Sequence, residues 1–495
     1  MHGSSEKIVR VSQERNFFFR HAAPGVCFLL LSGAALGVFG GARAQAQNPT
    51  SAADPFWGSA TAQPATGEAL KLSLDGAVER GFKNNLGLKE AESGEKSLHG
   101  EKEEVLQEFL PTITLTGDTG YHMIDLAAVG FRPNVLSEFP GKIPAGLANI
   151  VRLDLTDGQI HYNEILFSGP VIAGWKAAGA AERAAYFNKM VARGEVVQRV
   201  ATGYLRAIAD ESEVENARAL VAQAQVLEDH VHAAHEAGTA ANLDELRARV
   251  ELEAQQQRLI AAENQQAKDL ILLKREIGID PGQTIELTDP APYSELATET
   301  PEEVRAVAYK SRLDYVELQN QAVEYKAIHA AYRSQRLPTL SFNSYYGTST
   351  VDGAGTHGNF SAVGTLNFPL FREARLRGDE DASQAQLNAV NAQLADLRNQ
   401  IDEQVRAALL DVNAHKQLLD VARSNVDLAT RALSDETDRV NAGVDDNLPL
   451  VTAQATLATA ESNLVESLYQ YNVSKLLLAR AAGVLELQYR VYLGR

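Results

Sequence analysis

Histidines and acids lie on either side of a glycine-centred turn in the first half of the chain. His230, His232 and His235 precede the turn. Asp244 and Glu245 follow it. Helical spacing places only His232 and His235 on one face, three residues apart. Two ligands are too few for a usual transition-metal site, so the sequence predicts a solvated helix end, with a pH-sensitive contact as the alternative.

A similar turn in the second half is also followed by acids. The four candidate acids at the two turns are Asp244, Glu245, Asp445 and Asp446. In a symmetric oligomer each acid would repeat as a ring of like charge, which in a narrow pore favours cations. Acids in the first turn of a helix also suit the helix dipole. The sequence leaves both interpretations open.

Motifs for catalysis and cofactor binding do not occur in this sequence. It contains no nucleophile elbow, phosphate-binding glycine loop, zinc-protease helix or calcium loop. We therefore expect no enzyme activity, no cofactor and no metal site. The 64 acidic and 46 basic residues give a net charge of -18, which argues against a nucleic-acid partner.

The elements that carry these turns are predicted to be unusually long helices. No proline occurs between Pro170 and Pro281 or between Pro369 and Pro449. Residues 172–236 fit one helix of roughly 100 Å. In the second half, apolar residues recur at steps of three and four, close to the coiled-coil period: Leu387, Val390, Leu394, Leu397, Ile401, Val405, Ala408 and Val412.

The turns themselves carry helix-end signals. Gly238 and Gly443 are predicted to end the long helices. Asn242 and Asn447 are predicted to cap the helices that return, and Asn242 with Glu245 fits a capping box.

A further capping box is predicted where the second half begins. Thr300 is followed by Pro301 at the first helical position and by Glu303 three residues after the cap.

Four short segments show an alternating pattern that predicts strands. Ile113 and Leu115, for example, alternate with threonines. Each segment has about ten residues, the length that a tilted strand needs to cross a bilayer. The segments are 112–121, 151–162, 339–348 and 359–368.

Aromatic residues collect where the predicted strands meet the helices. They are Phe167, Trp175, Phe368 and Phe371. An interfacial belt at a membrane surface and ordinary packing at the junction both explain them.

The two halves of the chain match each other. Leu110-Pro111-Thr112 and Leu337-Pro338-Thr339 lie 227 residues apart, and Gly238 and Gly443 lie 205 apart. Each half reads helix, strand, loop, strand, long helix, turn and helix. The predicted divisions are a flexible segment 45–71, a first repeat 72–280 with a longer loop 122–150, a linker 281–301, a second repeat 302–486 and a tail 487–495.

The first 44 residues have the features of a cleaved secretory signal. A basic start precedes the short apolar run 26–39, and Ala42-Arg43-Ala44 fits a cleavage site. Cys27, the only cysteine, precedes the apolar run and is not placed for lipid attachment. We expect an exported mature chain without a lipid anchor.

Several landmarks together resemble the TolC-like outer membrane efflux protein family. They are Leu72-Ser73-Leu74-Asp75-Gly76-Ala77 with Asn84-Asn85, the Leu-Pro-Thr strand entries, the Leu-Phe strand exits at 166–167 and 370–371, and the Ala-Gly turns at 237–238 and 442–443. The resemblance implies a mainly α fold with a small membrane β part. It also implies a homotrimer that forms a 12-stranded β-barrel on a long α-helical barrel.

The resemblance further implies an outer-membrane location, with extension into the periplasm. The chain would be the exit duct of a tripartite efflux or type I secretion system, gated at the helix tips. Its partners would be a periplasmic adaptor and an inner-membrane pump of the RND or ABC type. The family often places aspartates six and nine residues after the second turn glycine, where this chain has Pro449 and Thr452.

The sequence also allows a different class of protein. A periplasmic coiled-coil spacer or adaptor would explain the long helices without a membrane barrel. The strand pairs distinguish the two, because an open sheet edge in lipid leaves backbone groups unpaired and forces several chains to close the sheet. The exported cargo, whether drug, metal or protein, is not readable from the sequence.

Overall fold

The computed structural model describes one unit within Pro49–Arg495. The described residues are 53–60, 64–125, 150–239, 241–297, 300–351, 355–442 and 447–494. The predicted signal 1–44, most of the loop 122–150, and Gly443, Asp445 and Asp446 lie outside them. The unit is mostly helical with a smaller β part, which confirms the predicted class.

One order of elements occurs twice along the chain. The first half has α1 (Leu74–Asn84), α2 (Leu86–Gln107), β2 (Thr112–Asp125), β3 (Ile150–Phe167), α4 (Gly169–Glu236) and α5 (Asn242–Glu276). The second half has α6 (Pro301–Ser311), α7 (Leu313–Ser334), β5 (Thr339–Val351), β6 (Gly355–Asn367), α8 (Glu373–Asn441) and α9 (Asn447–Ala481). A short helix, α10 (Leu485–Tyr492), follows α9.

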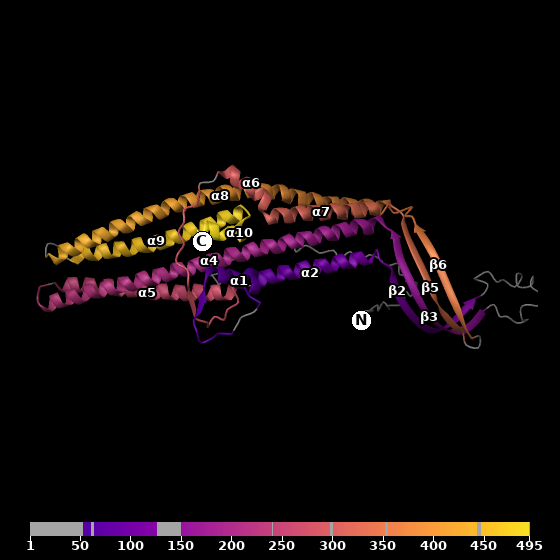
Figure 1. The fold of residues 1–495 in the computed structure, drawn as a ribbon, viewed down its shortest axis with the longest axis horizontal. Coiled ribbons are helices and arrows are strands. Elements are labelled where there is room, and N and C mark those ends of the chain that lie inside the picture. The colour runs from indigo at the N-terminus through magenta and orange to yellow at the C-terminus, as the bar shows by residue number, and fades with distance from the viewer. Residues whose placement is uncertain are drawn as a thin grey trace, which may run out of the picture. The chain divides into compact units, whose positions relative to one another are not determined.

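Two long helices run the length of the helical region. α4 has 68 residues and α8 has 69, so each is roughly 100 Å long. α4 packs against α2 and α7 on the side of the sheet, and against α5 and α9 farther along (Figure 1). In the stripe predicted on α8, Val390, Ile401, Val405, Ala408 and Val412 are buried.

The shorter helices meet end to end beside the long ones. At the end of α5, Asn84 Nδ2 donates a hydrogen bond to the carbonyl of Ile277 at 2.9 Å. At the end of α9, Gly483 adopts φ 75, and a Cβ added there would lie 2.7 Å from the Arg312 nitrogen at the start of α7. Gly278, the repeat partner of Gly483, adopts φ 73. Both joints therefore use a glycine in the left-handed region.

Segments outside the repeats pack at these joints. β1 (Leu70–Leu72) pairs in parallel with β4 (Ile285–Leu287). The short 3-10 helix η1 (Pro55–Trp57) lies against α2, where a Cβ added at Gly87 would be 2.7 Å from the Phe56 ring. The sequence predicted a flexible segment and a linker here, because three-residue strands are too short to show a period.

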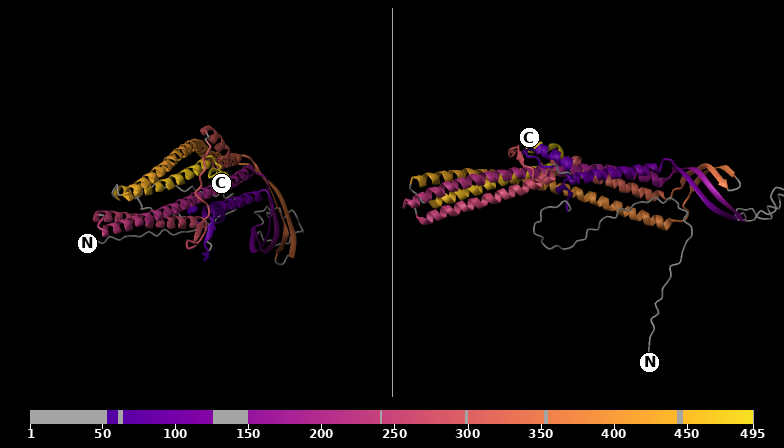
Figure 2. Two further views of the ribbon diagram at one scale, coloured as in Figure 1. Left: turned by 60° about the vertical axis from the view of Figure 1, so that its left-hand side comes forward. Right: turned by 90° about the horizontal axis from the view of Figure 1, so that it is seen from below.

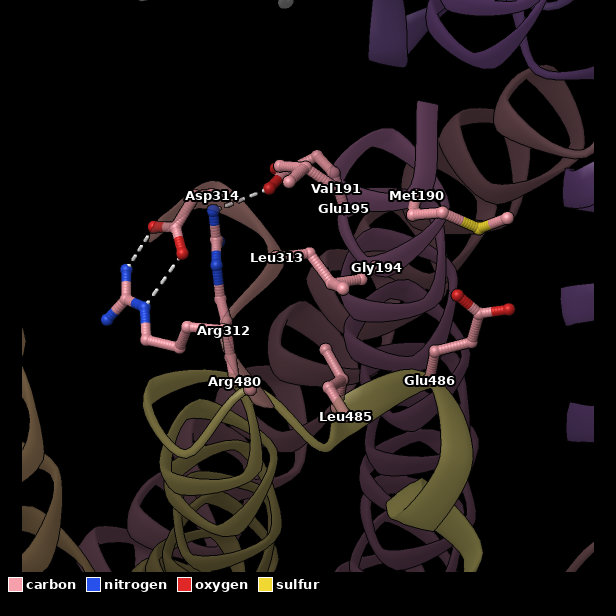
Figure 3. A pocket seen from close by; sticks show the side chains of 11 residues that line it. Met190, Val191, Gly194, Glu195, Arg312, Leu313, Asp314, Arg480, Leu485 and Glu486 are labelled. Atoms are coloured by element: carbon pink, nitrogen blue, oxygen red, sulfur yellow. Dashed lines mark hydrogen bonds and ion pairs between the residues drawn. The ribbon is translucent and has the colours of Figure 1, made fainter. Parts of the chain in front are cut away.

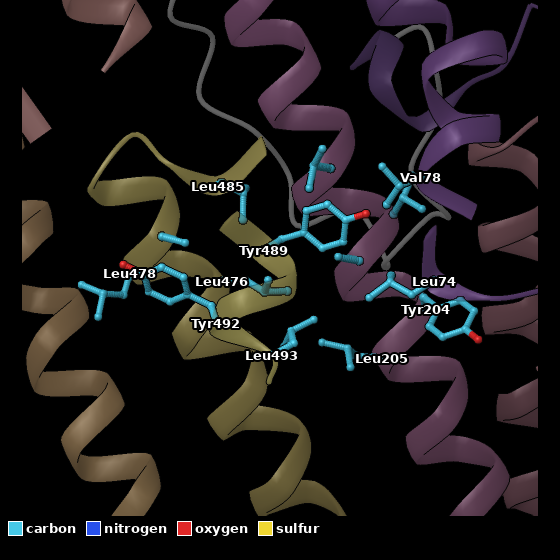
Figure 4. Packing of buried hydrophobic residues seen from close by; sticks show 14 of the residues in the cluster. Leu74, Val78, Tyr204, Leu205, Leu476, Leu478, Leu485, Tyr489, Tyr492 and Leu493 are labelled. Atoms are coloured by element: carbon cyan, nitrogen blue, oxygen red, sulfur yellow. The ribbon is translucent and has the colours of Figure 1, made fainter. Parts of the chain in front are cut away.

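The largest apolar core lies where α1, α4, α9 and α10 meet (Figure 4). Tyr204 is fully buried, and its hydroxyl donates to the Leu72 carbonyl at 2.8 Å. Tyr489 and Tyr492 of α10 pack into the same core. The predicted tail 487–495 therefore contains core residues of α10.

The capping box predicted at the start of the second half is confirmed. Thr300 Oγ1 accepts from the Glu303 nitrogen at 3.3 Å, and Glu303 Oε2 accepts from the Thr300 nitrogen at 3.0 Å. This cap starts α6, which packs on α8.

Candidate functional site

The four strands of the repeats form one antiparallel sheet. The order is β2-β3-β5-β6, so the sheet joins both halves of the chain through β3 and β5. The strands have 14, 18, 13 and 13 residues, more than the ten that the alternation predicted. Figure 2 shows the sheet continuing from the ends of the helices.

One face of this sheet carries exposed apolar side chains. Leu115, Ile160, Tyr346 and Phe360 are paired across the four strands, and residues opposite each other in a ladder share a face. Their exposed fractions are 80, 52, 66 and 69%. In water such a face would be costly, because about 25 cal/mol is lost for each Å² of apolar surface left exposed.

The opposite face carries a polar row next to this one. The neighbouring row across the sheet is Thr116, Gln159, Gly347 and Asn359. Thr116 Oγ1 lies 2.9 Å from His161 Nε2 on the adjacent strand. In these two rows, apolar side chains lie on one face and polar side chains on the other across all four strands, which is the pattern of a sheet with lipid on one side and water on the other. Toward the start of β3 the pattern reverses, because Leu153 and Leu155 share the face of Gln159.

The sheet also has two open edges. Among the described residues, β2 pairs only with β3, and β6 pairs only with β5. The outer edges of β2 and β6 therefore offer backbone donors and acceptors to further strands.

The four candidate aromatics lie at the boundaries of strands and helices. Phe167 ends β3 and is 43% exposed, and Phe368 and Phe371 follow β6 at 56 and 96%. Trp175 lies in α4, 41% exposed, with its ring edge-on to Phe109 at 6.5 Å. The sequence did not predict this partner, because Phe109 follows the end of α2 and contacts Trp175 only in the folded chain.

The first tip turn joins α4 and α5. Gly238 adopts φ 76, as a glycine after a helix end often does. The predicted Asn242 cap is wrong: α5 begins at Asn242, and Ala241 stands at the cap position without a side-chain hydrogen bond. The predicted capping box therefore does not form, because Glu245 faces α4 instead.

Glu245 joins the two helices of this tip. Its Oε1 lies 2.8 Å from His232 Nδ1, and its Oε2 lies 3.6 Å from His235 Nε2. The contact with Glu245, together with nearby Glu236, raises the pKa of His232. We call these three residues the tip clasp. The fold thus brings together His232, His235 and Glu245, whereas His230 is exposed.

The candidate pore acid Asp244 has a local partner. Its Oδ1 lies 3.4 Å from Arg247 Nη1, one turn along α5. Asp445 and Asp446 lie outside the described residues. The described part of the chain has no group of three His, Cys, Asp or Glu placed to hold a metal ion.

A small cavity of about 120 Å³ lies where α9 ends beside α4 and α7 (Figure 3). Arg480 pairs with Glu195 at 2.6 Å, and Arg312 pairs with Asp314 at 2.5 Å. The Arg480–Glu195 pair joins α9 to α4, whereas the Arg312–Asp314 pair lies within the start of α7. Local spacing did not predict the Arg480–Glu195 pair, because its two residues lie far apart in the chain.

Solved structures share this fold. Over 83% of this chain and 93% of the other, a Pseudomonas aeruginosa membrane protein superposes with a TM-score of 0.71 at 19% identity. The Vibrio cholerae outer membrane protein VceC matches with 0.69 at 16%, over 83% and 96%. The Campylobacter jejuni CmeC outer membrane channel matches with 0.69 at 14%, over 87% and 92%.

The second half of the chain also matches a known protein family. Residues 307–484, from α6 to the end of α9, match the model of the outer membrane efflux protein family. These residues therefore carry an outer membrane efflux protein domain. No curated protein sequence matches the chain.

The matched residues include both strands of the second half and its long helices. The sheet has an apolar row exposed, and the long helices carry the sheet at one end. Among the described residues, no helix is both long and apolar enough to cross a membrane.

Proposed function

We propose that this protein is a subunit of an outer-membrane exit duct, part of a tripartite efflux or type I secretion system. The proposal rests on the sheet, whose apolar row is exposed over all four strands. Lipid covers that face, and the polar row with Thr116, Gln159 and Asn359 lines a water-filled interior. The chain acts as a passive conduit and not as an enzyme.

The open edges determine the assembly. In hydrocarbon each unpaired backbone group costs several kcal/mol, so β2 of one chain pairs with β6 of the next until the sheet closes. We propose three chains, which give a 12-stranded barrel. Family resemblance supports this number, and the four strands in each chain agree with it.

The helices support the same closure. α5 and α8 lie at the two flanks of the helix order α5, α4, α9, α8. Both flanking helices expose large apolar side chains that a neighbouring copy would cover. On α5 these are Leu246, Val250, Ile260 and Ile271, and on α8 they are Leu410, Leu418, Val421 and Leu428.

A passive duct needs partner proteins that supply energy and a gate at its entrance. We propose a periplasmic adaptor and an inner-membrane pump of the RND or ABC type, which supplies the energy. The tip turns at Gly238 and Gly443 form the periplasmic entrance, and parting of the tip helices opens it. Asp244, Glu245, Asp445 and Asp446 are the candidates for charge selection there.

The mature protein in this proposal lacks residues 1–44 and has no lipid anchor. Phe167, Trp175, Phe368 and Phe371 form an interfacial belt at the membrane surface. The exposure of Phe167, Phe368 and Phe371 at strand ends, and of Trp175 near the start of α4, supports this role.

The decisive experiment is reconstitution of the purified mature protein into planar bilayers. We expect ion conductance from a detergent-resistant, heat-modifiable trimer in the outer-membrane fraction. Charge reversal at Asp445 and Asp446 should alter ion preference if they line the entrance, and unchanged preference would remove them from it. A water-soluble monomer without conductance would exclude the duct.

The alternative is a periplasmic coiled-coil spacer without a membrane barrel. A spacer in water has no cover for the apolar row of Leu115, Ile160, Tyr346 and Phe360. Recovery in the soluble periplasmic fraction would favour it.

A further inference from the structure

Arg206 of α4 faces carboxyl groups on three helices, away from the sheet and the tips. Its Nε lies 3.0 Å from Asp210 Oδ1 on α4 and 3.6 Å from Asp269 Oδ2 on α5. Its Nη1 lies 3.0 Å from Glu466 Oε2 on α9. We call these four residues the acidic junction. It links the first hairpin, α4–α5, to the second hairpin, α8–α9.

Asp210 is the buried member of the acidic junction. It is 5% exposed, and its Oδ2 has no hydrogen-bond partner. It lines a cavity of about 200 Å³ together with Glu213, Gln265 and Ser462. A buried carboxylate oxygen without a donor is costly, so Asp210 has reason to bind a proton there.

Further acids add to the negative charge at this place. On α4, Glu213 lines the same cavity, and on α9 Glu461 has its pKa raised by burial and by Glu213. Tyr469 of α9 lies under the Arg206 guanidinium at 5.3 Å. On α5, Asp269 accepts from Gln265 at 2.8 Å. One guanidinium therefore faces three carboxyl groups in its own contacts, with two more acids close by.

We propose that the acidic junction is a proton-operated contact that fastens the second hairpin to the first. A proton from solvent binds Asp210 Oδ2, which then donates a hydrogen bond to the Asp269 carboxylate. Repulsion between these acids falls, and Arg206 is free to hold Glu466 of α9. When the proton leaves, Asp210 and Asp269 compete with Glu466 for Arg206, and the contact between α9 and α4 weakens on the tip side of the junction, while the apolar core continues to hold the two helices together.

The pH range of this contact lies near neutrality. Burial raises the pKa of Asp210 to about 7, with Asp269 adding to the rise and Arg206 opposing it. Because the folded pKa lies above the unfolded value, the stabilisation is complete at acid pH and is lost as pH rises through about 7. The inference concerns helix packing and stands whether or not the sheet forms a duct.

Spin labels on α4 and α9 test the contact. The full-length chain with Cys27→Ser would carry labels at Ala219→Cys and Thr456→Cys, two exposed positions on the tip side of the junction. We expect one short distance at pH 5.5 and a longer, broader distribution at pH 8.5. Pulsed electron paramagnetic resonance measures both.

Two variants separate the junction from general pH effects. Asp210→Asn should give the same distribution at both pH values, whereas Glu211→Gln, an exposed neighbour on the same helix, should keep the wild-type response. Should Asp210→Asn not fold, Asp269→Asn should move the transition to lower pH, because it removes the like charge beside Asp210. A wild-type distribution independent of pH, or a transition that Asp269→Asn leaves unmoved, overturns the proposal.

Discussion

The sheet and the helical core use apolar side chains in opposite ways. In the core around Tyr204, Leu476 and Tyr489, helices from both halves of the chain cover them. In the sheet, Leu115 and Phe360 stand in rows of similar regularity and remain exposed. The difference teaches that the chain completes only one of its two apolar regions by itself. In the proposed duct, lipid covers the face of the other region and further copies pair with its edges.

The largest expected effect is in the core. Tyr204→Ala removes a fully buried ring and should lower the free energy of unfolding by about 3–5 kcal/mol, in detergent and in bilayers alike. Tyr186→Ala is the control, because Tyr186 is 42% exposed. Chemical denaturation measures the free energy of unfolding of both variants. An equal loss for the two would contradict the assignment of Tyr204 to a buried core.

A charge on the sheet tests whether lipid covers the apolar face. Leu115→Arg should destabilise the bilayer-inserted protein by about 2–4 kcal/mol, because arginine is costly near the bilayer midplane. Thr116→Arg, on the next residue and the opposite face, should cost much less. Unfolding from lipid vesicles measures both. If Thr116→Arg proves the more harmful, the assignment of the two faces is inverted.

Glycines within the sheet sharpen the comparison at the level of backbone packing. A Cβ at Gly347 would lie 2.2 Å from the Gly158 carbonyl oxygen, whereas one at Gly364 has open space. Gly347→Ala should therefore lose about 1–3 kcal/mol by overpacking, with little change for Gly364→Ala. Thermal unfolding of the protein in detergent measures this. A similar loss for both would show that the strands tolerate no added side chain at all.

The smallest effect is expected at the tip clasp, which neither core nor lipid covers. The pKa of His232 is raised, so the stabilisation is present in acid and fades as pH rises through the folded value. Hydrogen exchange near residues 236–245 should be slower at pH 5.5 than at 8.5, and added salt should reduce the difference. His232→Gln should abolish the response, while the exposed His230→Gln should retain it. A response that survives His232→Gln would assign it to other groups.

Local sequence patterns were sufficient to predict which segments form helices and which form strands. The absence of proline and the step of three and four predicted the long helices, and α4 begins three residues before the predicted start at 172. Alternation predicted strands, but it placed β2 and β3 shorter than they are, because their ends lose the strict pattern. The Asn242 cap was wrong because α5 already begins at Asn242 and Ala241 occupies the cap position, and Glu245 contacts His232 across the turn instead of completing a capping box.

The sequence by itself determined the periodicities, the repeat and the resemblance to an efflux family, because these depend on residues that are neighbours along the chain. Only the tertiary structure decided which side chains meet over long separations. It paired β1 with β4, joined Glu245 to two histidines, and brought Arg206 to acids from three helices. Such contacts depend on how helices and turns pack, and local spacing does not encode a partner that lies across a turn or on another helix.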